Sequence, residues 1–425
     1  MPQGFDFANA KSVGMESNLR GICIMLKTKE YKLKYLTEKI TKGTTPSNIG
    51  ETFTDEGIMY FRSELIGKTK YVDKSSGLLY ISESTHEKLK RSQIKENDML
   101  FSMAGIYLGK ISLVSSSDIP ANTNQAVAII RFNSSNIDLN YVYYYMTQKW
   151  YNSYINSLTA QAAQPNINLE QIGNLKLNLP DIKIQSKIAK IISRYDEAIE
   201  NNNKRIKLLE QMAQNLYKEW FVRFRFPGWE NTEFENGIPK GWKVEKLFDV
   251  VNVTYGYAFA SELFCEDKTL KPVVRIRDIL DNRTNTYTSE VCADKYIIKE
   301  HEILVGMDGI FHMCMWNGNK AYQNQRVVKL TSKTDEVSNY FLFLSVQPQV
   351  KFWEQIIAGT TVAHLGDKHL KRMTILLPSE NLLKESTKIF NSLMKQKNQL
   401  FIANENLAKQ RDLLLPRLMS GKLEV

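Results

Sequence analysis

Residues 175–193 read LKLNLPDIKIQSKIAKIIS, and the spacing of their apolar side chains changes at a proline. Before Pro180, apolar and polar residues alternate with the period of two that is typical of a β-strand. After it, apolar residues recur at intervals of three and four, which predicts a helix, and Asp181 is suited to cap the first amides of that helix. The stretch therefore predicts that a folded domain ends on a strand and a long helix begins at once.

The same junction occurs a second time in the chain. From residue 373 the sequence reads MTILLPSENLLKESTKIFNSLM, with Pro378 lying 198 positions after Pro180 and Ser379 in the capping position. Three further pairs of segments match at nearby offsets: IKENDMLFSMAGI from residue 94 with IIKEHEILVGMDGI from residue 297, NQAVAII from residue 124 with NQRVVKL from residue 324, and YVYYYMTQ from residue 141 with YFLFLSVQ from residue 340. Such regular offsets indicate a diverged tandem duplication.

Each half combines strands and helices. Short runs rich in Val, Ile, Tyr and Phe, bounded by Gly, Asn, Asp and Ser, predict strands, whereas residues 141–155 and 340–353 are more helix-like. We expect an α+β protein in which two tandem α/β domains are joined by two long helices that form an antiparallel coiled coil. The predicted divisions are an N-terminal extension 1–30, a first domain 31–180, a central helix 181–222, a linker 223–237, a second domain 238–378, a C-terminal helix 379–416 and a tail 417–425.

The two long helices share a heptad-like apolar stripe, whose members are Ile184, Ile188, Ile191, Tyr195, Ala198, Asn202, Leu209, Met212 and Leu216 in the first and Leu382, Ser386, Ile389, Leu393, Gln396, Leu400, Ala403, Leu407 and Leu414 in the second. A helix of about 35 residues cannot bury such a stripe alone, so we expect the two to pair as a spacer. Asn202 and Gln396, polar within the stripe, are candidates for fixing the register. The alternative is that these are ordinary helices packed on their own domains.

Composition limits the classes of function. The chain has 425 residues, which exceeds one ordinary core, and a net charge of +10, which favours a polyanionic partner such as DNA. No apolar run approaches the length of a membrane span and the N-terminus lacks a signal-peptide pattern, so we expect a cytoplasmic protein with no membrane contact. The four cysteines are isolated, which fits a reducing compartment.

The sequence lacks recognisable catalytic motifs. No two of its 21 glycines are spaced as GxG, and neither an Asn-Pro-Pro-aromatic nor a GxSxG motif is present. His312 and Cys314 form an isolated HxC that we interpret as a buried sulfur rather than a zinc site. We therefore expect neither catalytic residues nor a bound metal or cofactor in this chain.

Polar residues near predicted strand ends are candidates for contacts with DNA. Arg, Lys, Asn and Gln suit base edges, and Ser, Thr and Tyr suit bases or phosphates. The candidates are Lys42, Thr44, Thr45, Arg62, Asn124, Gln125 and Gln164 in the first half and Tyr255, Tyr257, Arg275, Arg277, Asn324, Gln325 and Arg326 in the second. For any one of them an ordinary surface or turn role is the alternative.

Four segments of the chain resemble a known family. They are LNLPDIKIQSKIAKIISRYDEAI from residue 177, YKEWFVRFRFPG from residue 217, IPKGWKVEKL from residue 238 and LLLPRLMSGKLEV from residue 413. These are similar to the inter-domain signatures of the specificity subunit of type I restriction-modification enzymes, and the likeness extends from Tyr31 onward. Arg223 and Arg225 depart from the pattern, since the family often has an acidic residue nearby.

The resemblance implies a subunit without catalytic activity, whose two target recognition domains each read one part of a split, asymmetric site in double-stranded DNA. It also implies that the helix pair sets the unread spacer. Partners would be two modification subunits, which bind S-adenosylmethionine and methylate adenine at N6, and restriction subunits that use ATP and magnesium. The other hypotheses are a coiled-coil scaffold that does not read DNA and a stand-alone DNA-modifying enzyme.

Overall fold

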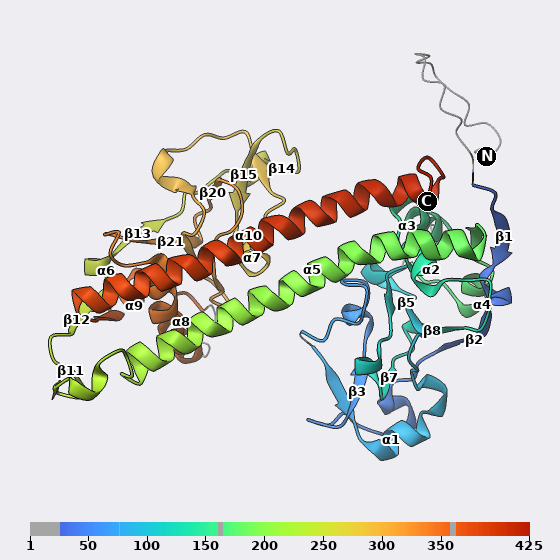
Figure 1. Ribbon diagram of the computed structural model, residues 1–425, viewed down its shortest axis with the longest axis horizontal. Helices are drawn as coiled ribbons and strands as arrows, with labels where there is room; N and C mark the ends of the chain where they lie inside the picture. Colours follow the sequence, from blue (N-terminus) through green and yellow to red (C-terminus); the bar gives the residue numbers. More distant parts are fainter. Residues whose placement is uncertain (1–25, 76, 160–164, 358–362) are drawn as a thin grey trace, which may run out of the picture. The chain divides into compact units, whose positions relative to one another are not determined.

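The computed structural model describes residues 26–75, 77–159, 165–357 and 363–425, which form two compact units (Figure 1). The first unit comprises the described residues up to Glu197 together with Leu407–Val425, and the second comprises Ala198–Asn406. Each unit therefore contains one mixed α/β domain and a segment of both long helices.

The first domain is built around a four-stranded antiparallel sheet in the order β2-β8-β5-β6. The inner strand β8 begins with VAII, four buried apolar residues in a row, which suits a strand covered on both faces. Ala128 and Ile130 pack into one core cluster, whereas Val127 and Ile129 pack into another. The strands are β2 (Thr37–Lys42), β8 (Val127–Phe132), β5 (Met99–Ser102) and β6 (Ile111–Leu113).

A second sheet of the first domain has the order β4-β3-β7, in which β3 and β7 run parallel. A separate antiparallel pair, β1 with β9, closes the domain beside the helix junction. These strands are β4 (Leu79–Ile81), β3 (Ile58–Phe61), β7 (Ala121–Thr123), β1 (Lys29–Lys32) and β9 (Lys176–Leu179). The helices are α1 (Glu83–Lys88), α2 (Leu139–Met146), α3 (Lys149–Ser157) and α4 (Leu169–Gly173).

The second domain repeats this plan, which confirms the duplication. Its four-stranded sheet has the order β13-β21-β18-β19, and its second sheet, β14-β16-β15-β20-β17, contains the parallel pair β15 and β20. The strands are β12 (Lys243–Lys246), β13 (Val251–Tyr255), β14 (Phe264–Cys265), β15 (Lys271–Val274), β16 (Tyr287–Thr288), β17 (Ile297–Ile298), β18 (Ile303–Gly306), β19 (Met313–Met315), β20 (Ala321–Gln323), β21 (Val327–Ser332) and β22 (Thr374–Leu377), with β12 paired to β22. The helices are α6 (Leu247–Val250), α7 (Ile276–Asp281), α8 (Asn339–Ile357) and α9 (Asp367–Leu370), and a two-residue hairpin of β10 (Phe234–Glu235) and β11 (Ile238–Pro239) precedes them.

Both strand-to-helix junctions lie where the sequence predicts them. Strand β9 ends at Leu179, and α5 (Ile182–Tyr217) begins two residues after Pro180. The Asp181 carboxylate accepts a hydrogen bond from the Lys183 amide at 2.9 Å, which confirms it as a cap. In the second unit α10 (Glu380–Met419) begins directly after Ser379. The predicted α+β class, with two tandem α/β domains and two long helices, is confirmed.

The two long helices lie side by side and antiparallel within each unit (Figure 1). In the first unit the Arg411 guanidinium contacts the Asp196 carboxylate at 2.7 Å. In the second unit Asn202 donates to the side-chain oxygen of Asn404 at 2.9 Å, and Lys397 contacts Glu210 at 2.6 Å. Residue numbers rise along one helix as they fall along the other, so each unit contains part of an antiparallel pair.

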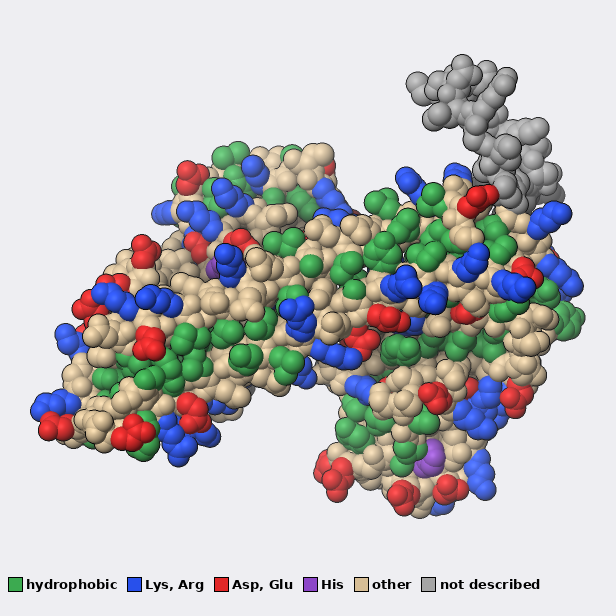
Figure 2. Space-filling model, in the orientation of Figure 1, with side chains coloured by type: hydrophobic (Ala, Val, Ile, Leu, Met, Phe, Trp, Pro, Cys, Tyr) green, Lys and Arg blue, Asp and Glu red, His purple; other side chains and the backbone are tan. Residues whose placement is uncertain are grey.

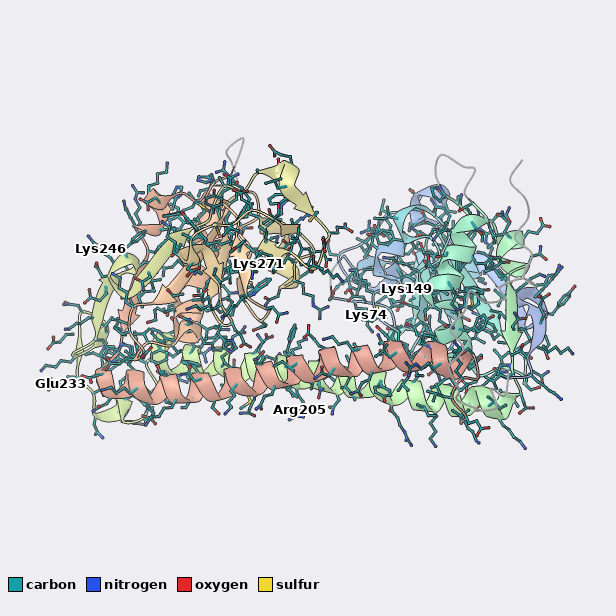
Figure 3. All side chains as sticks on the ribbon, turned by 90° about the horizontal axis from the view of Figure 1, so that it is seen from above. Lys74, Lys149, Arg205, Glu233, Lys246 and Lys271 are labelled. Atoms are coloured by element: carbon teal, nitrogen blue, oxygen red, sulfur yellow. The ribbon has the colours of Figure 1, made fainter. Side chains whose placement is uncertain are left out.

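The structure corrects two members of the predicted stripe. Met212 is 57% exposed and the neighbouring Ala213 is buried in its place. An α-helix drifts by about 20° per heptad against a strict seven-residue repeat, which moves the buried face to the next residue. Gln396 is exposed, and the partner of Asn202 is Asn404 because the antiparallel register brings residue 404 opposite residue 202. Arg205 lies on the exposed side of α5 (Figure 3).

The segment that follows α5 is part of the core of the second unit. Residues Lys218–Val222 form a π-helical turn, in which Trp220 and Phe221 are buried. The Phe221 ring lies 5.0 Å from that of Phe341 and 6.0 Å from that of Trp242, measured between ring centroids. The aromatic residues of this signature therefore fasten α5 to the second domain.

Candidate nucleic-acid interface

In the first domain the loop after β2 lies against the turn between β7 and β8. Lys42 ends β2, and the Thr44 amide donates to the Thr123 carbonyl at 3.0 Å. A Cβ at Gly43 would lie 1.9 Å from the same carbonyl oxygen, so the close approach requires glycine. The Thr45 hydroxyl donates to the side-chain oxygen of Gln125.

Arg62 and Asn124 emerge beside this loop. Because β3 and β7 are parallel, with Phe61 opposite Thr123, the residues that follow them leave the sheet at the same edge. Arg62 is 3.5 Å from the Glu64 carboxylate, and the Asn124 side chain accepts from the Ala126 amide at 3.2 Å. The structure thus brings together five of the predicted residues: Thr44, Thr45, Arg62, Asn124 and Gln125. Gln164 lies outside the described residues.

Arg91 belongs to the same cluster, although the sequence interpretation missed it. Its Nη2 donates to the Thr44 hydroxyl at 3.2 Å. The residue follows α1 within the basic run KLKR, and that run was the signal that could have indicated it. Arg91 and Thr44 are 47 positions apart in the sequence, so a local pattern of residues could not predict their contact.

The second domain repeats the loop with other side chains. Tyr255 ends β13, and the Tyr257 amide donates to the Gln323 carbonyl at 2.9 Å. A Cβ at Gly256 would lie 1.9 Å from the Asn324 carbonyl oxygen. The Tyr255 hydroxyl is directed elsewhere, because it donates to Asp367 at 2.7 Å.

The remaining candidates of the second domain divide into two groups. The Asn324 amide donates to the Val274 carbonyl at 3.1 Å, which places Arg275 beside it, and Gln325 and Arg326 are exposed in the same β20–β21 turn. Arg277 is instead directed to Thr286, whose hydroxyl accepts from its Nη2 at 3.2 Å. Tyr257, Arg275, Asn324, Gln325 and Arg326 thus lie at the loop edge, whereas Arg277 does not.

Two tyrosines of these clusters stay protonated at ordinary pH. Burial raises the pKa of Tyr60 to about 12. A hydrogen bond with the Thr45 side chain and the positive charge of Arg62 both act in the opposite direction. The hydrogen bond with Glu290 raises the pKa of the Tyr257 hydroxyl. Because the Tyr60 hydroxyl donates to the Thr44 carbonyl at 3.1 Å, it supports the backbone of the loop after β2.

Within the described ranges, no group of three or more His, Cys, Asp and Glu side chains is arranged to hold a metal ion. The sequence predicts a buried sulfur at Cys314; the residue is partly buried, and desolvation raises the pKa of its thiol to about 12. The described helices also include none with both the length and the apolar character needed to cross a membrane.

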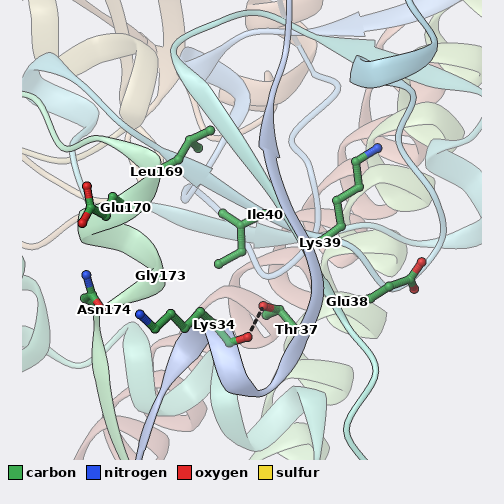
Figure 4. Close-up of a pocket in the computed structure, with 9 residues that line it drawn as sticks. All are labelled: Lys34, Thr37, Glu38, Lys39, Ile40, Leu169, Glu170, Gly173 and Asn174. Atoms are coloured by element: carbon green, nitrogen blue, oxygen red, sulfur yellow. Dashed lines mark hydrogen bonds between the residues drawn. The ribbon is translucent and has the colours of Figure 1, made fainter.

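A shallow cavity of about 280 Å³ lies between the start of β2 and α4 (Figure 4). Lys34 and Lys39 line it together with Glu38 and Glu170, and the Thr37 hydroxyl donates to the Lys34 carbonyl at 3.4 Å. Two positive and two negative side chains offset each other, so the cavity has no clear preference for an anion such as phosphate.

Charge alone does not mark the interface. On the face shown in Figure 2, Lys and Arg side chains are interspersed with Asp and Glu side chains in both units. The position of loops at the strand ends, rather than the density of charge, therefore defines the candidate surface.

Gly256→Ala is expected to destabilise the loop of the second domain by about 1–3 kcal/mol, because a methyl group would displace the backbone from Asn324. Faster hydrogen exchange of the Tyr257 amide would report this loss. Gly366→Ala is the matched control, since its new Cβ would make only an ordinary contact of 3.4 Å with the His364 ring. Equal exchange in both variants would contradict the prediction.

The fold and the two loop clusters define a class: a duplicated protein whose halves share one scaffold and present different side chains. The family model for the type I restriction modification DNA specificity domain matches residues 25–211 and again residues 239–407. The chain belongs to this family and carries two copies of its domain. The resemblance of the chain to this family is thereby confirmed.

Relatives of the chain carry the corresponding names. A type I restriction enzyme MjaIX specificity subunit from Methanocaldococcus jannaschii is 25% identical over 93% of both chains. The EcoBI specificity subunit from Escherichia coli is 28% identical over 44% of this chain and 40% of its own. The crystal structure of the S subunit from M. genitalium has a TM-score of 0.55 at 15% identity, and covers 95% of this chain and 98% of the other, which supports the fold.

Proposed function

We propose that this chain is the sequence-reading subunit of a type I restriction-modification complex, in which each domain reads one half of an asymmetric, bipartite DNA site. The observation that carries the proposal is the repeated loop with unlike side chains. Thr44 and Ala126 of the first domain correspond to Tyr257 and Arg326 of the second, at positions where the backbone hydrogen bonds are retained. Identical readers would recognise a palindrome, whereas unlike readers select two different half-sites.

The second part of the proposal is that the helix pair sets the length of DNA left unread between the half-sites. α5 continues for 36 residues and α10 for 40. The contacts of Asp196 with Arg411 and of Asn202 with Asn404 keep one antiparallel register in both units. A paired helix is stiffer than a single one and cannot slide without breaking such contacts.

Catalysis belongs to partner subunits in this proposal, and the present chain recognises the site. Two modification subunits would bind S-adenosylmethionine and methylate adenine at N6 after it leaves the base stack, and restriction subunits would use ATP and magnesium. Exposed apolar side chains on the long helices support a surface for partner subunits. They include Leu208 and Met212 on α5 and Ile402 and Leu413 on α10.

Exchange of residues 238–378 for the corresponding domain of a relative is expected to change one half of the recognised sequence completely and leave the other half unchanged. The result follows because the loop clusters of the two domains are separate sets of residues. Methylated adenines, mapped in cells that produce the chain with its modification subunits, would give both halves directly.

Exchange of residues 31–180 is the control and should change the other half. A change in both halves from a single exchange would contradict the division of labour. Binding that ignores both DNA sequence and salt concentration would favour a protein scaffold, since phosphate contacts weaken steeply with salt.

A further inference from the structure

Three loops of the second domain bring Asp308, Arg326 and His364 together. Asp308 follows β18, Arg326 lies in the β20–β21 turn and His364 lies between α8 and α9. One oxygen of the Asp308 carboxylate is 3.4 Å from Arg326 Nε, and the other is 2.6 Å from His364 Nδ1. A single carboxylate therefore holds two side chains that come from different loops.

The arginine remains available for a further contact. The side chain of Arg326 is 54% exposed, and its contact with Asp308 is made through Nε at 3.4 Å, so more than half of the side-chain surface is open to a ligand. Holding a flexible side chain in one orientation before binding lowers the conformational entropy that binding costs. The arrangement thus suits a contact that depends on direction.

The first domain shows that folding does not require these three side chains. Its equivalent positions are Ala104, Ala126 and Asn166, and Ala104 pairs with Asn166 as Asp308 pairs with His364. The supporting backbone bonds are retained: the Met103 amide donates to the Ala126 carbonyl at 2.8 Å, and the Met307 amide donates to the Arg326 carbonyl at 3.0 Å. The scaffold forms with small neutral residues, so the charged set has another role.

We propose that Arg326 reads a guanine in the half-site of the second domain and that Asp308 is the positioning residue that orients it. This inference rests on the proposed function. Arginine donates two parallel hydrogen bonds to O6 and N7 of guanine in the major groove, and that geometry requires a fixed guanidinium. The carboxylate also offsets the positive charge, which weakens attraction to phosphate and favours directional recognition of a base. His364 holds Asp308 from its other side.

The test uses the full chain assembled with its modification subunits, and selects bound duplexes from a randomised pool. The native complex is expected to require guanine at one position of the second half-site. Arg326→Ala should lower that preference by about 10- to 100-fold and leave every other position unchanged. Asp308→Ala should lower the same preference to a smaller extent.

The double variant separates positioning from general damage. Because Asp308 acts through Arg326, Asp308→Ala should have no further effect in the Arg326→Ala background. The triple variant Asp308→Ala/Arg326→Ala/His364→Asn copies the residues of the first domain, and should fold and retain the first half-site. Arg283→Ala is the matched control, because Arg283 is another exposed arginine of this domain whose Nη2 lies 3.9 Å from a carboxylate, that of Glu405, and it should leave the guanine preference intact.

Three results would overturn the inference: an unchanged guanine preference, an equal loss of binding to all sequences, which marks a phosphate contact, or an added effect of Asp308→Ala without Arg326. If the native complex shows no sequence preference at all, the proposed function itself fails. If it selects a bipartite site that these variants leave unaltered, only the present inference fails.

Discussion

Arg131→Met is expected to destabilise the first domain by about 3–5 kcal/mol, because it leaves a carboxylate buried without its counter-charge. Arg131 Nε and Nη2 donate to the two oxygens of Asp98 at 2.8 and 2.7 Å. The Asp98 side chain is fully buried, and its carboxylate also accepts a hydrogen bond from the Lys95 amide at 2.8 Å. Methionine keeps much of the length of the side chain, so the loss measures the charge pair rather than a cavity.

Hydrogen exchange is the appropriate measurement, since a chain with two units has no single two-state unfolding transition. The amides of β5 and β8 should exchange faster in the variant. Lys329→Met is the control in the second domain, where the amino group contacts Glu302 at 3.3 Å, and it should affect β18 and β21 instead. The double variant Asp98→Leu/Arg131→Met should recover part of the loss. If it is as unstable as the single variant, the buried charge is not the cause.

Lengthening both long helices by one heptad is expected to widen the unread spacer by about three base pairs, since seven residues add about 10 Å and each base pair spans about 3.4 Å. The insertions belong opposite each other, between Asn203 and Lys204 of α5 and between Ile402 and Ala403 of α10, so that the antiparallel register is kept. Affinity for the original site should fall by about 1,000-fold or more, to the level of non-specific DNA. Selection from a randomised pool should recover the same half-sites at the new separation.

Arg205→Ala serves as the control for the insertion, because it alters an exposed residue of α5 without changing its length. Its spacer should equal that of the native chain. Recovery of the original spacer from the lengthened chain would refute the idea that the helices measure DNA. New bases within the half-sites would indicate that the insertion disturbs the domains themselves.

The two halves retain buried features of the scaffold and vary the surface loops. Asp98 accepts the Lys95 amide just before β5, and Glu302 accepts the Lys299 amide at 2.7 Å just before β18. The glycines that approach the neighbouring turn are also repeated, at Gly43 and Gly256. A scaffold held in this way tolerates changes at exposed loop positions. A DNA specificity subunit requires this tolerance if different members of its family are to recognise different DNA sequences.

The candidate site could be predicted only in part from the sequence. Asn124 and Gln125 were found because their motif repeats at Asn324 and Gln325, directly before a buried strand. Asp308, His364 and Arg91 were missed because each meets its partner only after distant loops fold together. Arg277, another predicted candidate, donates from α7 to the Thr286 hydroxyl, a contact that the sequence did not indicate.

The sequence by itself determined the duplication, the two strand-to-helix junctions and the long helices. These depend on local periodicity and on the positions of Pro180 and Pro378, which a linear chain already contains. Only the tertiary structure decided that Asn404 rather than Gln396 contacts Asn202. It also decided that Ala213 takes the place of Met212 in the buried face. Finally, it decided that Asp308 contacts both Arg326 and His364. The reason is physical: the register of paired helices and the meeting of separate loops depend on packing between distant segments, which the local pattern of residues does not specify.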